Sequence, residues 1–233
     1  MNAIAQPMAE TAGRRVYVWE APVRLTHWLI VGSMLVLAVT GIFIGTPLSL
    51  ASGEARDHFI MGTVRVVHFY AAIVFSLAVL SRIVWMFRGN RYARWDQFIP
   101  TRRERRRDIS GMLRFYLFLD REPPPNLGHN PLAGMAYLAV FGLYLVMILT
   151  GLGMYAAYAP VGSSFRAFLF VGPMLGGLQR LHLIHHVAMW LLLGFAAHHI
   201  WSAVEVSTVE ANNTLESIVT GYKSVPPGGA HDV

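Results

Sequence analysis

The chain has 233 residues, of which 55% are hydrophobic and 14% are charged, whereas soluble domains usually carry about 25% charged residues. This composition excludes a disordered chain and argues against an ordinary soluble enzyme. The formal net charge is +6 and there is no cysteine, which excludes disulfides, cysteine-bound Fe–S clusters, c-type haem attachment and thiol nucleophiles on this chain.

Four apolar segments are long enough to cross a membrane, which takes about 20 mostly apolar residues. Residues 1–22 precede them as a tail, because charged residues interrupt this stretch and it lacks the pattern of a signal peptide. We therefore predict an all-α fold, an integral membrane four-helix bundle over residues 23–205, followed by a tail at 206–233. The predicted spans are residues 23–45, 62–87, 132–155 and 181–204.

The first two spans hold polar residues, which are rare inside a membrane and usually functional. His27 lies near the start of the first span, and Gly41 follows it by 14 residues. The second span holds Arg65 and His68 near its start. Arg82 follows His68 by 14 residues.

The loop over residues 88–122 contains ten arginines, and the other two loops between spans are poor in basic residues. Basic loops stay on the cytoplasmic side, so we predict that this loop and both termini are cytoplasmic. The arginines are then topogenic and face lipid headgroups, and no nucleic-acid partner is expected. A short interfacial helix is predicted over residues 109–119.

The last span is rich in histidine, and a shorter apolar stretch precedes it. Residues 165–175 are too few to cross a membrane, so we predict a short interfacial or re-entrant piece. The fourth span has one group of histidines near its start and another near its end: His182, His185, His186, His198 and His199.

Helix geometry selects two of these five histidines. Residues 14 apart are rotated by about 1400°, roughly 40° short of four turns, and separated by about 21 Å along the axis. Only His185 and His199 have this spacing in the fourth span. Since successive spans are antiparallel, His185 is level with His68 and His199 is level with His27. Two layers of paired imidazoles suit two b-type haems.

The polar neighbours fit the same two layers. His68 and His185 form the pair on the far side of the membrane, and His27 and His199 form the pair on the cytoplasmic side. Gly41 is level with the far-side pair and leaves room for a porphyrin, although close helix packing would also explain a glycine. Arg82 is level with the cytoplasmic pair, where a haem propionate would bind it. Arg65 either binds the other propionates or extends its head group to the interface. Zinc is less suited, since each layer supplies two ligands and no carboxylate or cysteine completes the site.

Several stretches of the chain are similar to one known family and together cover residues 16–224. They include VYVWEAPVRLTHW (16–28), TGIFIG (40–45), MGTVRVVHF (61–69), GHNPLA (128–133), ILTGLGMY (148–155) and SIVTGYKS (217–224). In these the chain resembles the b-type cytochrome subunit of membrane-bound nickel–iron hydrogenases, within the cytochrome b561 and formate dehydrogenase gamma-like superfamily.

This resemblance implies a multi-pass subunit of a hetero-oligomer in the bacterial cytoplasmic membrane, holding two haem b on His27, His68, His185 and His199. Electrons would arrive from the Fe–S small subunit, cross both haems and reduce quinone near the cytoplasmic side. The large nickel–iron subunit would split hydrogen, because a chain without cysteine cannot hold that centre. We expect no catalytic residue in this chain.

The resemblance also points to His129 and Asn130 as contacts for a quinone carbonyl, although Asn130 is equally suited to cap the third span. The chain departs from the family's usual pattern at Thr26, Arg180 and His186. Two alternatives stay open. One is the cytochrome subunit of a formate dehydrogenase or thiosulfate reductase, and the other is a haem-free membrane anchor or transporter.

Overall fold

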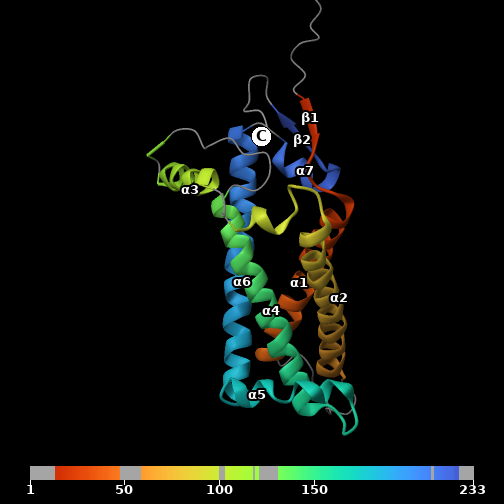
Figure 1. Cartoon of the computed structure of the whole chain (residues 1–233). Coiled ribbons are helices and arrows are strands. Elements are labelled where there is room, and N and C mark those ends of the chain that lie inside the picture. Colours follow the sequence, from red (N-terminus) through yellow and green to blue (C-terminus); the bar gives the residue numbers. More distant parts are fainter. Residues whose placement is uncertain are drawn as a thin grey trace, which may run out of the picture. The chain divides into compact units, whose positions relative to one another are not determined.

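The computed structural model describes residues 14–47, 59–99, 103–117, 119–120, 131–210 and 213–225. Four helices dominate it (Figure 1), and each has the length and the apolar composition needed to cross a membrane. They are α1 (Ala21–Gly45), α2 (Ile60–Arg88), α4 (Pro131–Tyr158) and α6 (Leu178–Glu210). The prediction of four long apolar helices is confirmed, and most of their ends extend beyond the predicted spans.

Shorter elements occupy the connections. The arginine-rich loop contains the 3₁₀ helix η2 (Trp95–Gln97) and α3 (Arg103–Tyr116), which starts earlier in the sequence than the predicted interfacial helix. The predicted short piece before α6 consists of η3 (Ser164–Phe168) and α5 (Val171–Met174). Beyond α6 lie α7 (Thr214–Thr220) and the second of two short strands.

The chain divides into two compact units, and the division cuts through the long helices. The helical unit contains residues 25–85 and 137–198, and the terminal unit contains residues 1–24, 86–136 and 199–233. His68 and His185 belong to the helical unit. Each unit has its own set of internal contacts, described below.

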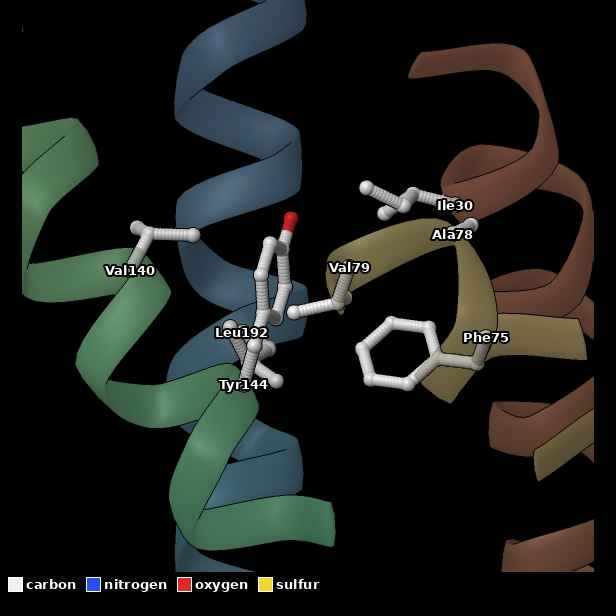
Figure 2. Close-up of a cluster of buried hydrophobic side chains, with 7 residues drawn as sticks. All are labelled: Ile30, Phe75, Ala78, Val79, Val140, Tyr144 and Leu192. Carbon is white, nitrogen blue, oxygen red and sulfur yellow. The ribbon is translucent and has the colours of Figure 1, made fainter. Parts of the chain in front are cut away.

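All four long helices contribute side chains to the core of the helical unit (Figure 2). α2 supplies Phe75, Ala78 and Val79, which meet residues of α1, α4 and α6. Phe75 packs edge-on against Tyr144 of α4, with the ring centroids 5.2 Å apart. The other members of the cluster are Ile30, Val140 and Leu192. Many residues on the outward faces of the same helices are large, apolar and exposed, as expected for helices in contact with lipid.

An aromatic cluster attaches η3 to two of the long helices. Phe69 of α2 stacks on Tyr155 of α4, with centroids 4.6 Å apart and an interplanar angle of 23°. Phe165 of η3 packs edge-on against Tyr155 at 5.0 Å. The short segment is therefore anchored by aromatic contacts, which contribute beyond the area they bury.

The terminal unit joins the two ends of the chain. Strand β1 (Arg14–Tyr17) pairs antiparallel with β2 (Tyr222–Val225), and the two arrows lie next to each other in Figure 1. Gly221 precedes β2 with a φ of 90°, and its carbonyl accepts the amides of Val18 at 2.8 Å and Trp19 at 3.1 Å. The Trp19 indole donates to the buried Ser217 hydroxyl at 3.0 Å.

The loop after α2 is bonded to the same assembly. The Asn90 amide donates to the Glu20 carboxylate at 2.8 Å, and its side-chain nitrogen donates to the Val18 carbonyl at 2.9 Å. These bonds hold the segment after β1, the turn before β2 and the start of the arginine-rich loop together.

The all-α prediction missed this small sheet. Its strands have four residues each and fall within the predicted tails at 1–22 and 206–233. Strands this short are stabilised by pairing and by the turn residues around them, rather than by an alternating pattern that the sequence would reveal.

Candidate functional site

His68 of α2 is held by the end of α1. The hydroxyl oxygen of Thr40 lies 2.8 Å from Nδ1 of His68. The next residue, Gly41, faces the same ring: a Cβ added there would lie 3.3 Å from the imidazole Cε1. The glycine predicted to leave room beside the far-side pair thus lies directly against one of its histidines.

His185 of α6 is held in the same way by α4. The hydroxyl oxygen of Thr150 lies 2.8 Å from Nδ1 of His185. Gly151 follows it, and a Cβ added there would lie 3.6 Å from the His185 Cε1. A Thr-Gly pair on one helix therefore faces a histidine on the next long helix twice in this chain.

A further contact brings these arrangements to the same level. A Cβ on Gly41 would lie 3.9 Å from the sulfur of Met189, and Met189 is one turn after His185 on α6. The structure thus brings together two of the four predicted ligands, from facing helices and at one level of the bundle.

The neighbouring histidines of α6 are arranged differently. Nδ1 of His182 lies 2.8 Å from the Leu178 carbonyl, and Nδ1 of His186 lies 2.8 Å from the His182 carbonyl. Both rings are bonded to their own helix. The ring of His186 packs onto α1, where a Cβ on Gly45 would lie 2.9 Å from its Nε2.

The remaining predicted residues lie in varied surroundings. Arg82 is buried, with 6% of its surface exposed. The side chain of Arg65 is exposed. His27 is half-buried, with the Trp28 ring edge-on at 5.1 Å. His199 is half-buried in the terminal unit, while His129 and Asn130 lie outside the described residues.

Sequence reasoning missed the two threonines. A threonine inside a helix is an ordinary residue, and only its position opposite a histidine distinguishes it. The available signal was the repeated dipeptide at Thr40-Gly41 and Thr150-Gly151, since each pair lies near the end of a span that is followed by a histidine-bearing span.

These surroundings fit a haem iron ligated by two histidines. Each imidazole is bonded through Nδ1, so Nε2 is the nitrogen left for a metal, and ligating histidines almost always have such a second bond. No group of three or more histidine, aspartate or glutamate residues suited to another metal occurs among the described residues. Paired imidazoles between the helices of a membrane bundle are characteristic of b-type cytochromes.

Comparison with known proteins agrees with this class. The family model described as prokaryotic cytochrome b561 matches residues 18–221. The chain is 40% identical to the "Probable Ni/Fe-hydrogenase B-type cytochrome subunit" of Cupriavidus necator, an alignment that covers 91% of this chain and 88% of the relative. It is 39% identical to the "Probable Ni/Fe-hydrogenase 1 B-type cytochrome subunit" of Escherichia coli K12, with 89% and 90% covered.

The chain is therefore a membrane cytochrome of the b type. It belongs to the prokaryotic cytochrome b561 family, and this membership implies haem b as its bound group.

Proposed function

We propose that this chain is the membrane electron-transfer subunit of an uptake nickel–iron hydrogenase. In this role it accepts electrons from the Fe–S small subunit and delivers them, through two haem b groups, to quinone. The observation that supports this proposal most directly is the pair of histidines His68 and His185. Each is hydrogen-bonded through Nδ1 to a threonine of a neighbouring helix. The names of the relatives support the hydrogenase as the partner.

His68 and His185 would hold the haem on the far side of the membrane from the arginine-rich loop. His27 and His199 would hold the second haem, an assignment that rests on the 14-residue spacing between His185 and His199. Haem supplies a one-electron carrier when it is bound.

The chain's own residues set the surroundings of these carriers. The buried Arg82 supplies a positive charge that would neutralise a propionate inside the bundle. The core between Ile30, Phe75 and Leu192 is apolar and excludes water from the space between the helices. Gly41 would leave room for the porphyrin of the far-side haem, and Arg65 would offer a positive charge to its propionates. His129 or Asn130 would donate a hydrogen bond to a quinone carbonyl.

The first test is the haem content of the purified hydrogenase complex, measured as a pyridine haemochrome per copy of this chain. We expect about two haem b per chain. His68→Ala or His185→Ala should each remove the far-side haem, and His27→Ala or His199→Ala the other. His182→Ala is the matched control on α6, and it should retain both. A His185→Ala protein with both haems and unchanged potentials would refute the assignment.

The second test identifies the partner enzyme. In membranes that contain the complex, hydrogen gas should reduce the b haems and then quinone. His129→Ala should slow quinone reduction while haem reduction by hydrogen is retained. Reduction by formate but not by hydrogen would assign the chain to a formate dehydrogenase instead. Absence of haem from the complex would identify a haem-free anchor or transporter.

A further inference from the structure

The geometry points to Thr40 and Thr150 as positioning residues that hold His68 and His185 in one tautomer, with Nδ1 protonated and Nε2 directed to the iron. The inference deepens the proposed function and rests on the far-side haem proposed above. It assigns a role to two residues that do not touch the iron.

The tautomer follows from the hydrogen bonds of the two threonines. A hydroxyl group has one hydrogen to donate. The Thr40 oxygen lies 2.7 Å from the Val36 carbonyl oxygen, one turn earlier in α1. The Thr150 oxygen lies 2.6 Å from the Val146 carbonyl oxygen in α4. Two oxygens this close need a hydrogen between them, and a carbonyl has none, so each threonine donates to its own helix.

Each threonine oxygen must then accept the hydrogen bond from the histidine. At 2.8 Å from Nδ1, it does so only if Nδ1 carries the proton. A neutral imidazole with a protonated Nδ1 has its lone pair on Nε2, which is the form that binds a metal. The hydrogen-bond chain from backbone carbonyl to hydroxyl to imidazole therefore selects the ligating nitrogen before any metal is bound.

The same arrangement occurs twice, once between α1 and α2 and once between α4 and α6. Thr40 precedes His68 by 28 residues, and Thr150 precedes His185 by 35. In both cases a threonine near the end of one long helix bonds the histidine in the second or third turn of the next, and a glycine follows the threonine. The two proposed haem ligands thus donate equivalent hydrogen bonds to threonines of two different helices.

The inference predicts an electronic effect. An imidazole that donates its N–H to an acceptor becomes a stronger base, and this raises its donation to the metal. Stronger donation stabilises the ferric state of a haem relative to the ferrous state and lowers the reduction potential. Removal of either threonine hydroxyl should therefore raise the potential of the far-side haem.

We would measure reduction potentials by spectroelectrochemical titration of the purified complex with Thr40→Val and Thr150→Val, which keep the shape of the side chain. Each variant should raise the potential of the far-side haem, and the double variant should raise it further. The other haem should keep its potential. Thr40→Ser and Thr150→Ser retain the hydroxyl and should behave as the unmodified chain.

Ser33→Ala is the matched control. The Ser33 hydroxyl is buried and lies 2.6 Å from the Leu29 carbonyl, one turn earlier in α1. Within the part of the chain that the structure describes, its hydrogen bonds go to the Leu29 and Ile30 carbonyls of α1. Its loss should leave the far-side potential unchanged, so a shift in this control equal to those of the valine variants would overturn the inference.

A second measurement compares two replacement ligands, first with both threonines in place and then with Thr150→Val added. The complex carrying His185→Gly is supplied with imidazole or with 1-methylimidazole as the replacement ligand. Imidazole has an N–H group that can donate a hydrogen bond to the Thr150 hydroxyl oxygen. In 1-methylimidazole a methyl group takes the place of that hydrogen. The haem restored with imidazole should have the lower potential, and in Thr150→Val this difference should vanish.

The outcomes separate the inference from the proposed function. Equal potentials with the two ligands, or valine variants with unchanged potentials and full haem, would overturn the role of the threonines while the haem assignment stands. Loss of the far-side haem in the valine variants but not in the serine variants would support that role. Retention of both haems in His68→Ala and His185→Ala would instead refute the proposed site itself.

Discussion

At the scale of single residues, the position of a side chain opposite its neighbour decides its role. His182, His185 and His186 lie within five residues of one another on α6, yet only His185 is bonded to another long helix. The 14-residue spacing selected His185 from the sequence, and its ligation of iron stays a prediction. The threonine that accepts its N–H could not be selected, since sequence spacing carries no information about which helix packs opposite.

The two glycines beside these histidines should differ in their tolerance of a methyl group. A Cβ at Gly41 would lie 3.3 Å from the His68 ring, closer than ordinary contact, whereas a Cβ at Gly151 would lie 3.6 Å from the His185 ring. Gly41→Ala should therefore displace its histidine and lower the far-side haem content more than Gly151→Ala. Haem content per chain measures this difference, and equal values in the two variants would contradict it.

A pH-dependent contact joins Arg114, in the last turn of α3, to Asp120. Arg114 donates to Asp120 from Nε at 2.9 Å and from Nη2 at 3.1 Å. This hydrogen bond and the guanidinium charge lower the pKa of the Asp120 carboxyl below its ordinary value of 3.8. Since the folded pKa is the lower one, the contact is fully present above pH 3.8 and is lost as the pH falls through the folded pKa.

The test is hydrogen exchange at the Leu119 amide, which bonds to the Arg114 carbonyl at 2.8 Å. Asp120→Asn should speed this exchange at neutral pH, and the difference from the unmodified chain should disappear in strong acid. Overall stability should barely change because the pair is exposed to solvent. A difference that persisted in strong acid would show that the charge of Asp120 is not the cause.

At the scale of helices and strands, close packing distinguishes glycines that the sequence presents as equivalent. Gly153 of α4 faces two buried side chains: a Cβ there would lie 2.9 Å from the Val171 Cβ and 3.1 Å from the Leu181 Cδ2. Gly142, on the same helix, has open space around it. The first glycine allows α5 and α6 to approach α4, and the second has no such role.

Alanine at these two positions should therefore act in opposite directions. Gly153→Ala should destabilise the protein by about 1–3 kcal/mol through overpacking. Gly142→Ala should be neutral or stabilise it by up to about 1 kcal/mol, because glycine is a poor helix former. Thermal unfolding in detergent, followed by circular dichroism, gives both values. A Gly153→Ala protein as stable as Gly142→Ala would show that α5 moves away without cost.

At the scale of the whole molecule, one set of bonds ties the chain ends to the arginine-rich loop. Trp19, Asn90 and Gly221 are far apart in the sequence and join these segments. All of them should lie on the cytoplasmic side, because the arginines of residues 88–122 resist translocation. The loop between α4 and η3 should lie on the opposite side, since α4 crosses the membrane once.

Thiol labelling can test this orientation, because the chain has no cysteine of its own. Arg106→Cys and Val161→Cys each introduce one thiol at an exposed position. A membrane-impermeant maleimide should label the thiol at position 161 in spheroplasts and the thiol at position 106 in inverted vesicles. Labelling in the reverse pattern would place the arginine-rich loop outside the cell.

Much of the fold was determined by the sequence alone. The number and approximate limits of the long helices follow from the lengths of apolar runs, which are a local property. Helix geometry predicts the levels of the histidines, and the structure brings His68 and His185 to one level. The pairing of β1 with β2, the aromatic contacts of η3, and the bonds from Thr40 and Thr150 to histidine join residues distant in sequence. Only the tertiary structure decided these, because hydrogen bonds and packing between helices depend on which faces meet, and a single chain's periodicity does not encode that choice.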